Sequence, residues 1–201
     1  MTTLAKAGAP ALRSLLRHRE ASVLIMLLAI AVFLAFSNEY FLSSRNLLNV
    51  GRQASVVAIV ALGQALVIIA RGIDLSVGSV IGVSAVVAAV VLQATGIQSL
   101  GLLVGLLTGL VCGIANGLMV TRLRINPFIA TLGMLSVARG IALLVTGGIP
   151  VMFTGWAEFL GAGRIWQIPV SFILMLILAL AVHILATRHR LGREIYAIGD
   201  N

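Results

Sequence analysis

Charged residues are scarce in this chain of 201 residues, and only six of them are Asp or Glu. Charged residues make up 10% of the sequence, whereas a soluble domain carries about 25%. Hydrophobic residues account for 60%, and the mean hydropathy is +1.13. This composition excludes an ordinary soluble domain and favours a protein built from membrane-spanning helices.

Cysteine and the motifs of common enzymes are also missing. Cys112 is the single cysteine and lies inside an apolar run, which excludes a disulfide framework and a cysteine-based metal site. The three histidines have no metal-ligand spacing as a set. The sequence contains no G-x-x-x-x-G-K-[ST] nucleotide loop, no H-E-x-x-H and no G-x-S-x-G. We therefore expect no catalytic residue, no metal and no cofactor.

A net charge of +8 is compatible with nucleic-acid binding, but the placement of the basic residues is not. They cluster between long apolar runs, where the loops of a membrane protein lie, so lipid and not nucleic acid is the expected surrounding. At about 20 residues per span, the sequence predicts an all-α, polytopic transmembrane helical bundle with about six spans. The apolar runs are residues 21–36, 53–70, 75–94, 99–120, 127–147 and 169–187.

The asymmetry of Lys and Arg predicts the orientation of these spans. With the N-terminus in the cytoplasm, ten of the 14 Lys and Arg residues fall inside, three fall outside, and Arg139 lies within a span. This distribution places both termini on the cytoplasmic side. Residues 1–20 then form a basic cytoplasmic segment, and residues 21–187 form the transmembrane domain.

Asp74 is the only acidic residue between Glu39 and Glu158, and it separates two apolar runs. A carboxylate at the centre of a membrane helix costs about 2.5–3.5 kcal/mol, so Asp74 is expected at a helix end, inside the protein or on a water-filled path. It either caps the third helix, accepting from the backbone N–H of Ser76 or Val77 with Arg71 as a pairing partner, or shapes a permeation path or gate. The two roles are compatible, because a helix break at membrane depth is tolerated where it is buried or lines a cavity.

Other polar residues lie at helical depth. Arg139 is twelve residues after Pro127, about 18 Å into a helix, and is expected either in a structural role in the interior or along a path. Gln64 and Asn116 carry amide side chains, and such side chains within spans cross-link helices more often than they contact substrate.

Five glycines four residues apart form a slowly drifting stripe on one face of the fourth span, because each step turns by about 400°. Such a stripe lets another backbone approach closely, either within one subunit or between two subunits. The glycines are Gly101, Gly105, Gly109, Gly113 and Gly117. Residues 147–169, with interleaved tryptophans, are read either as an interfacial loop with one short helix or as a docking surface for an external partner.

The stretch around Asp74 also belongs to a wider pattern. Four separated parts of the sequence, in order and at suitable spacing over about residues 40–201, together resemble the ribose-type family of sugar-importing ABC permeases. These parts are residues 46–50 with 63–68, the string Gly72-Ile73-Asp74-Leu75-Ser76-Val77-Gly78-Ser79, residues 116–118 with 126–133 and 139–140, and residues 191–201.

The resemblance implies the permease subunit of a binding-protein-dependent importer for a simple sugar such as ribose or xylose, in a bacterial cytoplasmic (inner) membrane. Such a subunit performs no bond chemistry. The implied partners are an ATP-binding subunit inside, a periplasmic or extracellular sugar-binding protein outside, and a second permease copy in a homo- or heterodimer.

The resemblance also implies an architecture. Family members have about ten spans, so this chain is expected to be the N-terminal part of such a fold, with residues 188–201 starting the cytoplasmic segment that couples to the ATPase. Asp200 stands where members usually have a glycine. The candidates for path or gate are Asp74, Ser76, Gly78, Gln64, Asn116 and Arg139. The candidates for ATPase coupling are Gly192, Arg193, Glu194, Gly199 and Asn201.

Three alternatives stay open. Related ABC permeases carry other small polar solutes, such as amino acids or nucleosides. A secondary transporter would need no ATPase, but such proteins usually display several buried ionisable groups. An intramembrane aspartyl protease would need a second carboxylate beside Asp74, and the spans offer none.

Overall fold

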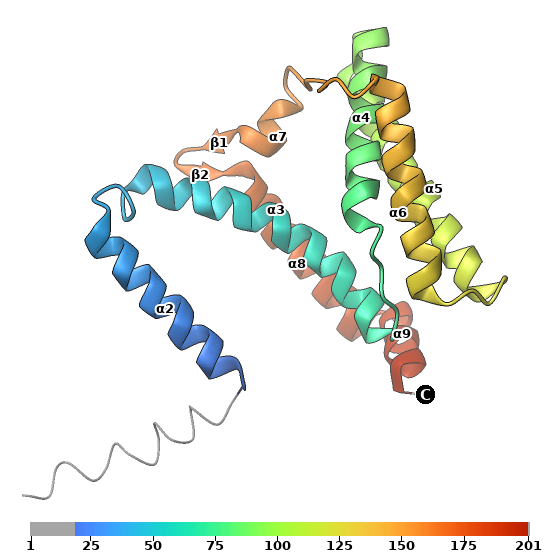
Figure 1. The fold of residues 1–201 in the computed structure, drawn as a ribbon, viewed down its shortest axis with the longest axis horizontal. Helices are drawn as coiled ribbons and strands as arrows, with labels where there is room; N and C mark the ends of the chain where they lie inside the picture. Colours follow the sequence, from blue (N-terminus) through green and yellow to red (C-terminus); the bar gives the residue numbers. More distant parts are fainter. Residues whose placement is uncertain (1–18, 201) are drawn as a thin grey trace, which may run out of the picture. The chain divides into compact units, whose positions relative to one another are not determined.

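The computed structural model describes residues 19–200 and consists almost entirely of helices (Figure 1). The predicted basic segment 1–20 lies almost wholly outside the described residues, as does Asn201. Six apolar helices correspond to the six predicted runs, and five of them are long and apolar enough to cross a membrane. They are α3 (Ser44–Ile69), α4 (Val77–Thr95), α5 (Gln98–Thr121), α6 (Pro127–Thr146) and α8 (Val170–Arg188).

The sixth apolar helix, α2 (Arg19–Ser37), has a shorter apolar part, Val23–Ser37. Short elements complete the chain: α7 (Glu158–Ala162), β1 (Arg164–Ile165), β2 (Ile168–Pro169) and α9 (Arg190–Asp200). The prediction of an all-α polytopic membrane bundle is confirmed. The chain divides into two compact units between Val50 and Gly51.

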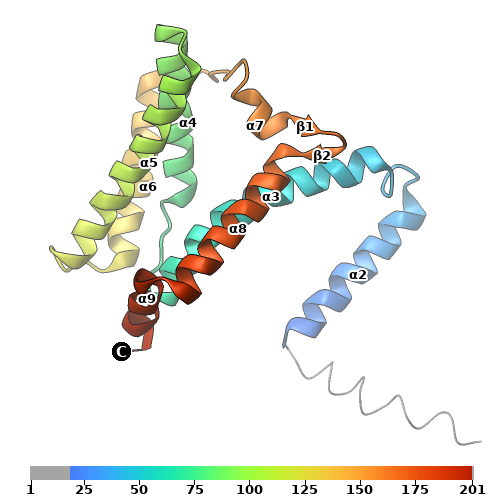
Figure 2. The same ribbon diagram turned by 180° about the vertical axis from the view of Figure 1, so that it is seen from behind.

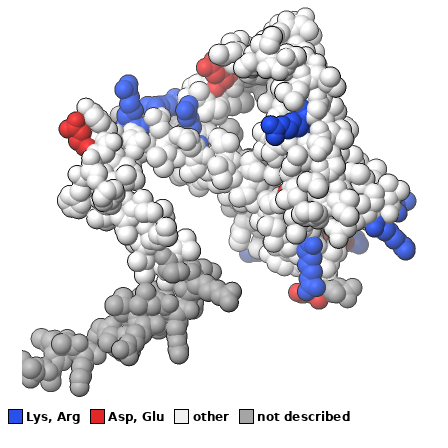
Figure 3. All heavy atoms as spheres, in the orientation of Figure 1, with Lys and Arg blue, Asp and Glu red and all other residues white. Residues whose placement is uncertain are grey.

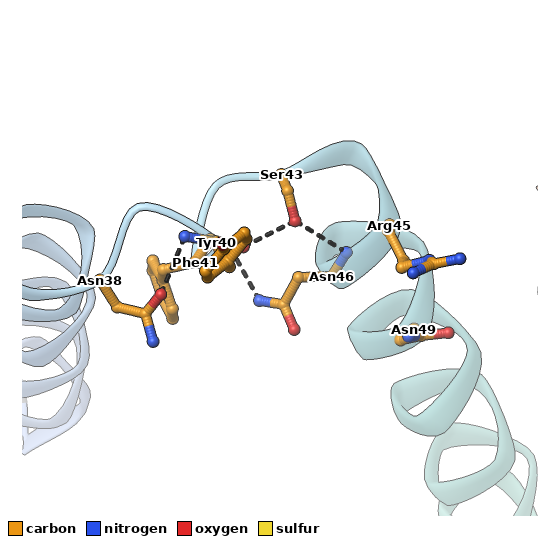
Figure 4. A pocket seen from close by; sticks show the side chains of 7 residues that line it. All are labelled: Asn38, Tyr40, Phe41, Ser43, Arg45, Asn46 and Asn49. Atoms are coloured by element: carbon orange, nitrogen blue, oxygen red, sulfur yellow. Dashed lines mark hydrogen bonds between the residues drawn. The ribbon is translucent and has the colours of Figure 1, made fainter.

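In the first unit, a tight turn joins α2 to the start of α3, and its polar side chains surround a hollow of about 390 Å³ (Figure 4). The Asn38 Oδ1 accepts from the Tyr40 N–H at 2.8 Å, and the Ser43 hydroxyl donates to the Tyr40 carbonyl at 2.6 Å. The Asn46 Nδ2 donates to the Phe41 carbonyl at 2.7 Å. These bonds satisfy backbone groups of the turn, and the Ser43 hydroxyl also accepts from the Asn46 N–H in the first turn of α3, so the side chains hold the turn in shape.

In the second unit, α4, α5 and α6 lie side by side (Figures 1 and 2). Local chemistry fixes their ends. The Asn126 side chain accepts from the Phe128 N–H at 2.9 Å, and Pro127 occupies the first turn, so α6 starts with a satisfied cap. Helices α4 and α6 end at Gly96 and Gly147, whose φ angles of 71° and 61° lie in the left-handed region that terminates helices.

Small residues fill the contact between these helices. A Cβ added at Gly101 would lie 2.6 Å from the Ala88 carbonyl oxygen, and one at Gly105 would lie 2.9 Å from the Ala88 Cβ. At Gly109 the nearest atom would be the Ser84 Oγ at 3.3 Å, and Gly113 and Gly117 have open space. The first part of the glycine stripe therefore lies against α4, as close backbone packing requires. The last part faces no neighbouring helix of the described chain.

The segment before α8 is ordered around a contact with the start of α5. The Gln98 Oε1 accepts from the Ala157 N–H at 3.0 Å, and a Cβ at Gly155 would collide with the Gln98 side chain. After α7, strands β1 and β2 form an antiparallel hairpin that pairs Arg164 with Pro169 and leads into α8. Exposed aromatic side chains, including Trp166 at 96% exposure, suit a membrane interface.

Candidate functional site

The candidate site is the non-helical stretch between α3 and α4. After Ile69, the Arg71 N–H donates to the Ile68 carbonyl and the Gly72 N–H to the Val67 carbonyl, both at 2.9 Å. Arg71 has a φ of 58°, in the left-handed region that closes a helix end. The chain then runs without helical bonds as far as Ser76, the residue that precedes α4. The predicted break between two apolar helices is present in the structure.

Asp74 binds the first residues of the following helix. Its Oδ1 accepts from the Ser76 backbone N–H at 2.8 Å and from the Ser76 hydroxyl at 2.6 Å. The predicted acceptance of a backbone N–H is therefore observed. The predicted pairing with Arg71 is not, because no ion pair between Arg71 and Asp74 occurs in the described part of the chain. The carboxylate is held by Ser76 and not by a cation.

Three helices hold the break through polar side chains. The Asn116 Nδ2, on α5, donates to the Ser76 Oγ at 2.9 Å. The Gln64 Nε2, on α3, donates to the Asp74 carbonyl at 3.1 Å. The Thr131 Oγ1, on α6, lies 3.3 Å from the Ile73 carbonyl oxygen, which competes for its single proton with the Pro127 carbonyl oxygen at 2.8 Å. We call this set of five residues, Gln64, Asp74, Ser76, Asn116 and Thr131, the break network.

The break network lies largely inside the protein. Ser76 is completely buried, Thr131 is 4% exposed and Asn116 is 8% exposed, while Asp74 and Gln64 are half-buried. The structure thus brings together four of the six predicted path or gate residues. Two carbonyl oxygens of this non-helical backbone, those of Ile73 and Asp74, lie within hydrogen-bond distance of protein side chains, as a break inside a membrane protein needs.

Thr131 was missed as a site residue by sequence reasoning. One turn into α6, a threonine is expected to bond the carbonyl four residues earlier, and the Thr131 hydroxyl does lie 2.8 Å from the Pro127 carbonyl. Its second contact, to Ile73, crosses 58 positions of sequence. The available signal was its place inside the matching segment 126–133, which says nothing about what it contacts.

Gly78 and Arg139 are not part of the break network. Gly78 lies in the first turn of α4, is exposed and has open space beside it. Arg139 is the only Lys or Arg in α4, α5 and α6 and is exposed. Figure 3 shows basic atoms within a surface that otherwise carries few charged side chains. No carboxylate or carbonyl partner for Arg139 occurs among the described residues. The helices described here therefore leave its guanidinium uncovered.

Four of the five predicted coupling residues lie on α9, and the fifth, Asn201, lies outside the described residues. Gly192 is buried against the carbonyl oxygens of Leu185 and Ala186, and a Cβ at Gly199 would collide with the Ile69 carbonyl oxygen at the end of α3. Arg193 and Glu194 are exposed, and Glu194 forms an ion pair of 2.8 Å with Arg190. The two glycines thus let α9 lie close to the ends of two apolar helices, while its charged residues face outward.

Several long apolar helices around a polar break that is held by protein side chains define a multi-pass membrane protein. The chain belongs to the family described as "Branched-chain amino acid transport system / permease component", whose family model matches residues 46–201. The predicted permease resemblance and the multi-pass location in a bacterial cytoplasmic membrane are confirmed.

Relatives give the comparison more detail. The chain is 36% identical over 180 residues to the D-allose transport system permease protein AlsC of Escherichia coli, covering 88% of this chain and 55% of that protein. It is 37% identical over 178 residues to the ribose import permease protein RbsC of Bacillus subtilis, covering 87% of this chain and 55% of that protein. A third relative, the autoinducer 2 import system permease protein LsrC of Salmonella typhi, is 36% identical over 198 residues, or 94% of this chain and 55% of that protein.

The chain therefore spans about 55% of the length of these relatives. No solved structure matches it.

Thr131→Val is expected to destabilise the protein, because it removes the hydroxyl whose proton the Pro127 and Ile73 carbonyls share and leaves the shape of the side chain nearly unchanged. The expected loss is about 1 kcal/mol of unfolding free energy, measured as thermal stability of the detergent-extracted protein. Thr108→Val is the matched control, because the Thr108 hydroxyl bonds only the Val104 carbonyl within its own helix. Equal losses from both substitutions would contradict a holding role for Thr131.

Proposed function

We propose that this chain is a membrane-spanning part of the permease subunit of an ATP-driven ABC importer for a simple sugar of the ribose or xylose type. The observation that carries the proposal is the similarity to relatives named as ribose and D-allose permeases, which extends through the break network. In this proposal, residues 21–187 form the transmembrane permease domain and supply the translocation path. The break network, with Gly78 and Arg139, lies along this path or at its gate.

The same proposal assigns partners to the two ends of the helices. An ATP-binding subunit meets the segment from residue 188 onward, where α9 presents the exposed Arg193 and Glu194. A sugar-binding protein meets the outer side, where residues 147–169 form α7 and the hairpin. A second permease copy completes the path. ATP hydrolysis in the partner subunit then drives solute movement, because the permease supplies none of that chemistry itself.

Uptake into proteoliposomes tests this function. The chain, with any natural extension it carries, is reconstituted with the ATP-binding subunit and the binding protein encoded beside it. Uptake of radiolabelled ribose, xylose, allose and leucine is measured with ATP inside the vesicles. We expect sugar uptake that needs both ATP and the binding protein and is unaffected by a protonophore.

Two other results would each establish a different function. Uptake of leucine without sugar would make the protein an amino-acid permease, the candidate favoured by the wording of the family description. Sugar uptake that persists without ATP and collapses with a protonophore would make it a secondary transporter. The single half-buried carboxylate of the break, Asp74, gives that second candidate little support.

A further inference from the structure

A hollow of about 410 Å³ lies between α3 and α7, within the second unit, and we call it the α3–α7 hollow. Four side chains of α3 and one residue of α7 line it: Arg52, Gln53, Val56, Val57 and Gly161. Its volume falls within the range of ligand pockets, about 300–1,000 Å³. The space between the two helices is therefore large enough to hold a small molecule or part of a larger one.

The lining of the α3–α7 hollow changes from polar to apolar along α3. Residues four apart on a helix are neighbours, so Arg52 lies beside Val56, and Gln53 lies beside Val57. Arg52 is half-buried and Gln53 is exposed, while Val56 and Val57 are 50% and 68% exposed. A ligand therefore meets guanidinium and amide N–H donors at one end of the hollow and bare valine at the other. A molecule with a polar head and a hydrocarbon tail matches this order.

The charge at the polar end favours an anion. No carboxylate pairs with Arg52 in the described part of the chain. Glu158, the acidic residue of α7, lines a different hollow with Gly155 and Phe159. The planar guanidinium of arginine presents paired N–H donors that match the oxygens of a phosphate. The valines beside it favour a phosphate that carries hydrocarbon over a free phosphate ion.

The α3–α7 hollow also lies at a boundary of the membrane. Residues 53–69 of α3 carry no charge, and Arg52 precedes them. These 17 residues span about 26 Å of helix, close to the thickness of the hydrocarbon core, which is about 30 Å. Trp156 and Trp166, before and after α7 in sequence, are 56% and 96% exposed, and tryptophan is enriched at the headgroup level. The charge of Arg52 and the aromatic residues around α7 thus place the polar end of the hollow among lipid headgroups.

We propose that the α3–α7 hollow binds a membrane phospholipid, with the headgroup phosphate against Arg52 and Gln53 and the hydrocarbon against Val56 and Val57. Gly161 leaves room for it, because a Cβ added there would meet nothing within 4 Å. The bound lipid bridges α3 and α7. This site goes beyond the proposed function, since it does not depend on which solute the protein carries.

Native mass spectrometry of the detergent-extracted protein tests the site. The chain, with any natural extension it carries, is titrated with phosphatidylglycerol and with a diacylglycerol that has the same acyl chains. We expect phosphatidylglycerol to bind about fivefold more tightly than diacylglycerol, which lacks the phosphate. Inorganic phosphate is added as a competitor and is expected not to displace the lipid, because it makes no contact with the valines.

Arg52→Gln is expected to weaken the binding of phosphatidylglycerol about five- to tenfold, because it removes the charge that faces the phosphate. Arg164→Gln is the matched control. It removes the same charge from an exposed residue of β1 that does not line the α3–α7 hollow. The control is expected to change the affinity by less than about twofold.

A second pair of variants keeps every charge and fills the space instead. Gly161→Leu places a side chain in the α3–α7 hollow, whereas Ala162→Leu, at the next position of α7, places one in the neighbouring hollow that Ala162 lines. Both positions are exposed, so both variants are expected to keep the wild-type profile in size-exclusion chromatography. Gly161→Leu is expected to weaken lipid binding about fivefold and Ala162→Leu to leave it unchanged.

The remaining outcomes would each overturn the proposal. Equal weakening by Arg52→Gln and Arg164→Gln would show a general attraction between basic residues and anionic lipid. Equal effects of Gly161→Leu and Ala162→Leu would show that the lipid binds elsewhere. Displacement of the lipid by inorganic phosphate would make this a site for the free ion. Unchanged lipid binding by Arg52→Gln, with weaker capture of the sugar-binding protein by the same variant, would assign Arg52 to an acidic surface of that partner.

Discussion

Gly101→Ala is expected to produce a marked loss of stability, about 1–3 kcal/mol of unfolding free energy. The added Cβ would lie 2.6 Å from the Ala88 carbonyl oxygen and 3.3 Å from the Leu92 Cβ. The nearer atom is backbone in the middle of α4, so no side-chain rotation relieves the collision and the two helices have to move apart. The measurement is the midpoint of thermal unfolding of the detergent-extracted protein.

Gly117→Ala on the same helix is the matched control. A Cβ there meets nothing within 4 Å. Alanine is also a better helix former than glycine by about 0.8–1.0 kcal/mol, so the control is expected to be neutral or slightly stabilising. A control that loses as much stability as Gly101→Ala would show that the glycines act through backbone flexibility and not through the contact with α4.

The difference between these two glycines marks what the sequence could predict about helix packing. The four-residue spacing identified a stripe of small residues, and its steps of about 400° mean a drift of about 40° per glycine. Over four steps the drift carries Gly117 about 160° away from Gly101, whereas Asn116 lies only about 60° from it. The side facing α4 therefore passes from glycine to asparagine along α5, which a list of equally spaced glycines does not reveal.

Helix boundaries show a second limit of the sequence. The apolar run at residues 53–70 predicted the end of α3 well, but the helix begins at Ser44. Its first turns carry Arg45, Asn46 and Asn49, which hydropathy assigns to a loop. The Ser43 hydroxyl accepts from the Asn46 N–H at 3.3 Å and so caps the N-terminal end of the helix, where the polar residues lie. By contrast, the Asn-Pro pair at the start of α6 is a local signal, and that boundary was predicted correctly.

The sequence identified site residues where a polar side chain stands alone in an apolar run, because burying such a side chain without a hydrogen-bond partner costs free energy. Asp74, Ser76, Gln64 and Asn116 were recognised on that ground or by resemblance, and they contact one another. The Arg71 pairing is not observed, and the Asp74 Oδ1 is instead held by the N–H and the hydroxyl of Ser76, two residues away in sequence. The contacts of Asn116 and Thr131 depend on the rotation and depth of two further helices, which no local pattern encodes.

Asp74→Ala is expected to cause the largest loss within the break. It removes the acceptor of both the Ser76 N–H and the Ser76 hydroxyl, and Ser76 is completely buried, so its polar groups cannot turn to water. An unsatisfied buried donor costs about 1–3 kcal/mol, and the lost charge near the start of α4 adds about 0.3–1 kcal/mol. Thermal stability in detergent and ATP-dependent uptake per folded molecule measure the two consequences.

Asp74→Asn separates the hydrogen bonds from the charge. The amide keeps an oxygen at the position of Oδ1, so both bonds from Ser76 can persist while the negative charge is lost. We therefore expect Asp74→Asn to retain most of the stability that Asp74→Ala loses. If both variants unfold at the wild-type temperature, Asp74 does not hold the break. If both lose the same large amount, the negative charge at the start of α4 and not the bonding of Ser76 is the dominant contribution, because only the charge is absent from both.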